Sequence, residues 1–240
     1  MNMALNRLQQ LEFESRIFVS LGIVALTCAL SFLVVPDAQP TFLYIGQALA
    51  FSDRTVVSLG YSFGAVLMLL VSLLRMWAGS VLTPTRIMAF KVQTDALKTC
   101  GPYRIVRNPI YLADFLAVFV FALYLPPVGL LMPALFFFHY QRLISFEEES
   151  LAGNFSESFA QYLSNTPRML PSTRSISHVS EAVKEFRINK EGFRHNALFL
   201  LFIPGFAVAA VTHEFNHAIL IGLPAVFDWA IIHTKIGRNK

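Results

Sequence analysis

The feature that most constrains this chain is a series of uncharged apolar blocks long enough to cross a lipid bilayer. Residues 17–35 and residues 55–74 contain no Asp, Glu, Lys or Arg, and a membrane-spanning helix needs roughly 20 apolar residues. The chain is 55% hydrophobic and only 14% charged, whereas a soluble domain is typically about 25% charged. This pattern excludes a disordered chain and argues against a soluble two-layer enzyme. It indicates a polytopic membrane protein.

Two further apolar blocks are each predicted to form a pair of helices. The uncharged stretch 115–141 is interrupted by Pro126-Pro127, and two adjacent prolines remove two helix donors. It therefore predicts a hairpin with one helix over 109–125 and a returning helix over 128–146. The stretch 196–233 is interrupted by polar residues 212–216. The expected fold is an all-α, polytopic transmembrane helical bundle of about six spans.

Basic residues alternate between the loops and predict the orientation. The loop 75–107 contains six Lys and Arg residues against one acidic residue, and 142–194 contains more basic residues, whereas 36–54 contains only Arg54. The positive-inside rule therefore places both termini and the two large loops in the cytoplasm. The net charge of +4 follows from this orientation and requires no nucleic-acid partner. The expected partner is the lipid bilayer.

The first polar motif, residues 99–111, reads TCGPYRIVRNPIY. Its Asn108-Pro109 pair is typical of a helix N-cap followed by proline at the first helical position. The free N–H groups of that helix would lie beside Arg104 and Arg107, as a site for a carboxylate or phosphate. The alternative is that Arg and Tyr side chains at a span end only contact lipid headgroups.

The second polar motif is the triplet Glu147-Glu148-Glu149, directly after the predicted returning helix. Carboxylates at a helix C-terminus oppose the helix dipole, so a compensating cation is expected nearby. Alternatively, the helix continues into the cytoplasm and the dipole argument no longer applies.

The proline turn predicts that the two motifs meet. The outgoing and returning helices would be about 25 Å and about 29 Å long, and a short turn makes them antiparallel neighbours. Arg107 and Asn108 would then lie beside Glu147 and Glu148 at the cytoplasmic level. Such a pocket suits a zwitterionic ligand.

With these residues the chain resembles the isoprenylcysteine carboxyl methyltransferase and phospholipid methyltransferase type of integral membrane methyltransferase, over roughly residues 75–171. The matching residues of the first motif are Gly101, Pro102, Tyr103, Arg107, Pro109 and Tyr111. Those of the second are Glu147, Glu148, Leu151, Phe155, Tyr162, Pro167 and Pro171. Asn108 stands where the family usually has His, and Asn cannot titrate near neutral pH.

The resemblance implies S-adenosylmethionine as the cofactor and methyl donor, a cytoplasmic helical cofactor-binding region, and a lipophilic methyl acceptor. The expected cofactor-binding residues are Gly101, Tyr103, Arg104, Arg107, Asn108, Pro109, Tyr111, Glu147, Glu148 and Tyr162. Those expected at the catalytic centre are Arg107, Asn108, Glu147 and Glu148. The acceptor is left open among isoprenylcysteine, a phospholipid amine and related molecules.

The expected domains are 1–100, with N-terminal transmembrane helices and a cytoplasmic loop, 101–171 as the methyltransferase core, and 172–240. The last comprises a cytoplasmic connector and a C-terminal transmembrane hairpin. Asp114, an ionisable residue inside a predicted span, is either functional or paired with a nearby Arg.

Three other functions are left open. One is a membrane NADPH-dependent reductase of the steroid-reductase type, and another is a non-catalytic lipid-binding or scaffold protein. The third is a zinc metalloprotease, because His213-Glu214-Phe215-Asn216-His217 fits the pattern H-E-x-x-H. We expect this last match to be a polar turn without a metal.

Overall fold

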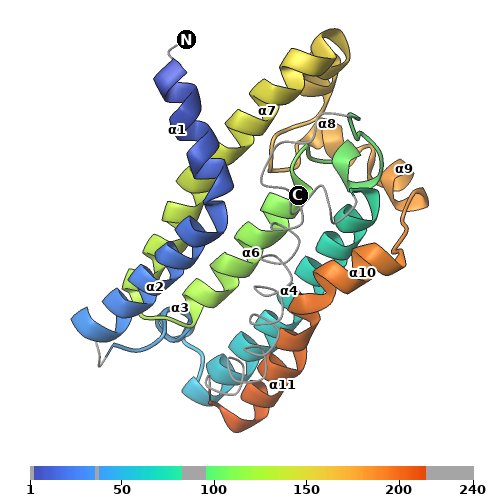
Figure 1. The fold of residues 1–240 in the computed structure, drawn as a ribbon. Helices are drawn as coiled ribbons and strands as arrows, with labels where there is room; N and C mark the ends of the chain where they lie inside the picture. The colour runs from blue at the N-terminus through green and yellow to red at the C-terminus, as the bar shows by residue number, and fades with distance from the viewer. Residues whose placement is uncertain (1–2, 36–37, 83–95, 215–240) are drawn as a thin grey trace.

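The structure, a computed structural model, describes residues 3–35, 38–82 and 96–214. Within these ranges the chain is all-helical and contains no strand (Figure 1), which confirms the all-α fold class. The first half contains α1 (Met3–Glu14), α2 (Arg16–Val34), α3 (Thr41–Ala48) and α4 (Asp53–Val81). The central part contains η1 (Gly101–Arg104), α6 (Pro109–Leu123), η2 (Pro127–Leu130) and α7 (Leu131–Asn165). The last part contains α8 (Thr173–Ile176), α9 (Val179–Lys184), α10 (Lys190–Asn196), η3 (Ala197–Leu201) and α11 (Phe202–Thr212).

Helix α6 is the central element of the bundle. It packs against α7 on one side and α4 on the other. Helices α1 and α2 pack on α7, whereas α10 and α11 pack on α4 (Figure 1). The first motif, the start of α6 and the second half of α7 therefore lie at one end of the bundle, the end that also carries α8 and α9 (Figure 1).

Two described helices, α2 and α4, are long and apolar enough to cross a membrane. Helix α2 is not the buried core of a soluble protein, because large apolar side chains such as Phe18 (69%) and Leu33 (81%) are exposed. Helix α6 and the segment Phe199–Thr212 are apolar but shorter. The last expected span falls largely outside the described residues, so six spans and cytoplasmic termini stay predictions.

The predicted hairpin is present, but its second helix is longer than expected. Helix α6 ends at Leu123, η2 makes the turn, and α7 returns antiparallel against α6. The prediction that the helix ends before the glutamate triplet was wrong, because α7 continues to Asn165 with a kink at Ser156 (φ 21°). The argument from the C-terminal dipole therefore does not apply to Glu147.

Aromatic packing holds the far end of α6 against α4 and α11. The Tyr124 hydroxyl donates a hydrogen bond to the Gly60 carbonyl at 2.6 Å, and its ring stacks on Tyr61 with centroids 5.2 Å apart. Phe206 of α11, fully buried, contacts the same Tyr124 ring. This cluster fixes the spacing between α4 and α6.

Gly64 tests this packing, because a Cβ at this position would overlap the Tyr124 hydroxyl and lie 2.9 Å from the Phe206 ring. Gly64→Ala should lower the free energy of unfolding by about 1–3 kcal/mol, as is typical of overpacking. Gly22→Ala in α2 is the control, since nothing lies within 4 Å of its Cβ position. Thermal melts in one detergent measure the stability of both variants. Equal melting temperatures for Gly64→Ala and Gly22→Ala would contradict the close packing at Gly64.

Candidate functional site

A cavity of about 410 Å³ lies between α2, α6 and α7 and reaches α4 and η3. This volume falls within the range of small-molecule sites, about 300–1,000 Å³. Its lining includes eight of the expected site residues: Tyr103, Arg107, Asn108, Pro109, Tyr111, Glu147, Glu148 and Tyr162. The two motifs, some forty residues apart in sequence, therefore share one cavity, as the hairpin predicted.

The start of α6 forms one wall of this cavity. Asn108 is the N-cap residue and Pro109 the first helical residue, as predicted, but the Asn108 side chain does not cap the helix. Its amide instead donates to the Arg168 carbonyl at 3.1 Å, which the Asn108 backbone N–H also contacts at 3.2 Å. The N–H groups of Ile110 and Tyr111, in the first turn, have no intrahelical acceptor.

Glu148 binds two arginines and joins both motifs. It accepts from Arg107 Nε at 2.9 Å and from Arg168 Nη2 at 2.5 Å. The side chains of Arg107 and Glu148 are only 11% and 12% exposed. Arg107 Nη1 donates to the carbonyls of Thr166 and Leu163. Such charge-assisted bonds fix the direction of the guanidinium.

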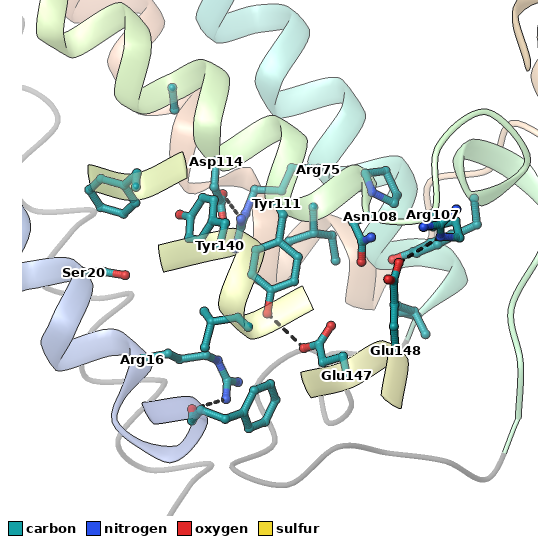
Figure 2. Close-up of a pocket in the computed structure, with 18 of the residues that line it drawn as sticks. Arg16, Ser20, Arg75, Arg107, Asn108, Tyr111, Asp114, Tyr140, Glu147 and Glu148 are labelled. Carbon is teal, nitrogen blue, oxygen red and sulfur yellow. Dashed lines mark hydrogen bonds and ion pairs between the residues drawn. The ribbon is translucent and has the colours of Figure 1, made fainter. Parts of the chain in front are cut away.

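Glu147 has a different partner from its neighbour, because consecutive helical residues point about 100° apart. It accepts from the Tyr111 hydroxyl at 2.9 Å (Figure 2). Burial raises the pKa of Glu147 to about 7, while Arg16 and the Tyr111 hydrogen bond oppose the rise and Glu148 adds to it. This carboxyl therefore changes charge near neutral pH.

Two buried tyrosines, Tyr103 and Tyr162, line the cavity at the end of the first motif. The Tyr162 hydroxyl donates to the Tyr103 carbonyl at 2.6 Å. Burial is the main cause that raises the pKa of both tyrosines above the usual value, so both stay neutral. Among the described residues, no partner bonds the Tyr103 hydroxyl.

Gly101 and Arg104, two expected cofactor-binding residues, do not line this cavity. The Gly101 N–H donates to Glu185 at 2.5 Å, and Arg104 Nη2 pairs with the same carboxylate at 2.8 Å. These contacts lower the pKa of Glu185. Gly101 has a φ of +58°, a left-handed conformation that explains glycine here without a ligand.

Three arginines of the site were not assigned to it from the sequence: Arg16, Arg75 and Arg168. The glutamate triplet predicted a nearby cation, but the sequence did not indicate which residue provides it. Arg168 meets that need at Glu148. Arg75 forms an ion pair with Asp114, which agrees with the alternative that this carboxylate is paired with a nearby Arg.

The zinc-protease pattern gains no support from the described part of the chain. His213 follows α11 in a left-handed conformation (φ 64°), and its Nε2 lies 3.4 Å from Ser58 Oγ. His217 lies outside the described residues. Within them, no cluster of three His, Cys, Asp or Glu residues could hold a metal ion.

Comparison with known proteins agrees with this geometry. Residues 59–158 match the model of the phospholipid methyltransferase family. This segment is therefore similar to that family of methyltransferases. It contains most of α4, the first motif, the hairpin and the glutamates, so the match confirms the resemblance found in the sequence. No curated protein and no solved structure matches the chain significantly.

The raised pKa of Glu147 predicts a specific pH dependence of stability. Because the folded-state pKa of Glu147, about 7, lies above the ordinary value of 4.5, the folded protein binds this proton more tightly than the unfolded chain does. The contribution of this proton to the free energy of unfolding is full below about pH 4.5 and is lost as the pH rises through 7. Between pH 5 and 9 the wild-type protein should lose up to about 3 kcal/mol relative to Glu147→Gln.

Thermal melts of the ligand-free protein across this pH range measure the effect. Glu149→Gln serves as the control, because Glu149 is exposed and its removal should leave the wild-type profile unchanged. If the stability of the wild type and of Glu147→Gln changed with pH in the same way, the raised pKa of Glu147 would be contradicted.

Proposed function

We propose that this protein is an integral membrane methyltransferase that transfers a methyl group from S-adenosylmethionine to a lipophilic acceptor. The observation that carries the proposal is one cavity with two kinds of wall. Its cytoplasmic end gathers Arg107, Glu147 and the start of α6, which suit a zwitterionic donor. Its remaining walls are largely apolar and come partly from α2. The family match supports methyl transfer rather than reduction by NADPH.

The donor fits the cytoplasmic end by charge. Its amino-acid carboxylate would bind Arg107 and the first-turn N–H groups of Ile110 and Tyr111, where a helix N-terminus favours an anion. Its ammonium group or ribose hydroxyls would bind Glu147. Glu148 is already bonded to two arginines, so its role would be to position Arg107 rather than to contact the donor.

Tyrosine side chains would complete the donor site. Tyr103, Tyr111 and Tyr162 all line the cavity and offer flat apolar surface for the adenosyl group. The hydrogen bond from Tyr162 to the Tyr103 carbonyl ties η1 to α7, so the walls come from both motifs.

The main task of the protein in this reaction would be to align the acceptor with the methyl group of the donor. In the transfer, the bond between the sulfonium sulfur and the methyl carbon breaks while the acceptor's nucleophilic atom bonds to that carbon. The electron pair of the broken bond stays on the sulfur, so the donor leaves as a neutral thioether, and an uncharged acceptor releases the proton of its attacking atom to solvent. Rate enhancement would come from in-line positioning and exclusion of water. Asn108 cannot serve as a general base, and its bonds to Arg168 give it a positioning role.

The proposal also places the enzyme in the membrane with both termini cytoplasmic. The apolar α2 and α4 support insertion, and the basic loops support this orientation. The donor site would then face the cytoplasm, where S-adenosylmethionine is available, and the acceptor would reach the cavity from the bilayer.

Calorimetric titration of the purified protein with S-adenosylhomocysteine tests the donor site. Glu147→Gln should weaken binding about 10- to 100-fold, the effect of losing a hydrogen bond to a charged group (about 1.5–3 kcal/mol). Glu148→Gln should weaken it by a similar factor, because Arg107 is then no longer held in place. Glu149 is the exposed glutamate next to Glu148, so Glu149→Gln should bind S-adenosylhomocysteine like the wild type. NADPH should not bind. Absence of S-adenosylhomocysteine binding to the wild type, or equal affinities for all variants, would refute the proposal.

A further inference from the structure

The cavity contains a second polar position, separate from the motif glutamates. Arg75 of α4 and Asp114 of α6 form an ion pair there, and both residues line the cavity. Asp114 follows Tyr111 by three residues, so it lies almost one helical turn, about 4.5 Å, further along α6. Tyr140 of α7 lies beside the pair (Figure 2). The pair is therefore close to the donor end but deeper in the bundle.

This ion pair leaves hydrogen-bonding capacity unused. Arg75 is 4% exposed, and among the described residues no partner accepts a hydrogen bond from its buried Nε–H. Asp114 keeps 25% of its side chain exposed. A buried donor without a partner destabilises a protein by about 1–3 kcal/mol. Asp114 therefore presents an acceptor to a ligand, and a small rotation of the Arg75 side chain would present the buried Nε–H as a donor.

The charge of the pair limits which ligand fits. Arg75 is already neutralised by Asp114, so the pair has no excess positive charge to offer an added anion, which would face the aspartate. In a low-dielectric site such a like charge is strongly disfavoured. An uncharged group that both donates and accepts a hydrogen bond meets both partners.

Apolar side chains surround this polar position. Phe199 of η3 lies with its ring centroid 5.2 Å from the Arg75 guanidinium carbon, and Phe202 lines the cavity next to it. The apolar side chains of Ile17, Leu21 and Val24 from α2 also line the cavity. These walls come from elements outside residues 59–158, the segment that matches the methyltransferase family.

We propose that Arg75 and Asp114 form the subsite for the polar head of the methyl acceptor and select an uncharged head that donates and accepts a hydrogen bond, such as a hydroxyl, over a carboxylate. The acceptor's apolar chain lies between α2 and η3. The head donates to Asp114 and accepts from Arg75 Nε. This inference rests on the proposed function, because the head reaches the methyl group only if the donor occupies the neighbouring end.

Photolabelling of the full protein in lipid nanodiscs, with S-adenosylhomocysteine bound, tests the subsite. The probes are a twelve-carbon alcohol with a diazirine near its hydroxyl and the matching carboxylic acid. In the wild type, the alcohol should label peptides of α6 and η3–α11 at least fivefold more than the acid. Asp114→Asn should reduce labelling by the alcohol at least fivefold. Equal labelling by the two probes in the wild type would overturn the inference even if the variant fails to fold.

Matched variants separate the possible outcomes. Glu12→Gln removes a carboxylate that pairs with Arg142 away from the cavity lining, and it should label like the wild type. Phe199→Ala should lower labelling by the alcohol severalfold, whereas Leu201→Ala should not, because Leu201 is 45% exposed and does not line the cavity.

Binding of S-adenosylhomocysteine distinguishes the two proposals. Asp114→Asn should keep the wild-type affinity for it, which also shows that the variant is folded. If the wild type binds S-adenosylhomocysteine but Asp114→Asn labels normally, the acceptor subsite is wrong and the donor site stands. If the wild type does not bind it, the proposed function fails and this inference with it.

Discussion

The geometry of the cavity depends on the contact of Glu148 with Arg107 and Arg168. Arg107 precedes α6, Glu148 lies in the middle of α7, and Arg168 follows α7, so a single carboxylate joins three segments. Arg107 and Glu148 are nearly buried, and a buried charge is tolerated only when it is paired, because removal of one partner costs about 3–5 kcal/mol. The bridge therefore brings the two motifs together and also fixes Arg107 at the cavity wall.

The two ends of the cavity come from different parts of the chain. The segment that matches the family supplies Arg107, Tyr111 and Glu147 at the polar end. Helix α2 and η3, outside that segment, supply apolar walls. Because the polar groups and the apolar walls come from separate segments, the two ends of the cavity can change independently.

The sequence predicted the hairpin and the meeting of its two ends, because both follow from local signals. Pro126-Pro127 marks the turn, and two apolar stretches of similar length must then return to one level. It misplaced the end of the second helix, since no proline or glycine pair follows Glu149 to stop α7 at that point. Gly101 and Arg104 could not be separated from the site by sequence, because their partner Glu185 lies more than eighty residues away. Arg75 and Arg168 were missed as site residues for the same reason: long-range pairing leaves no local pattern.

A density map of the protein with S-adenosylhomocysteine bound tests the central claim most directly. We expect the nucleoside to fill the cavity between α6 and α7, with its carboxylate at Arg107 and the start of α6 and its ribose or ammonium group at Glu147. Density for the nucleoside outside this cavity, for example in the polar cleft lined by Arg104, Arg174 and His178, would contradict it.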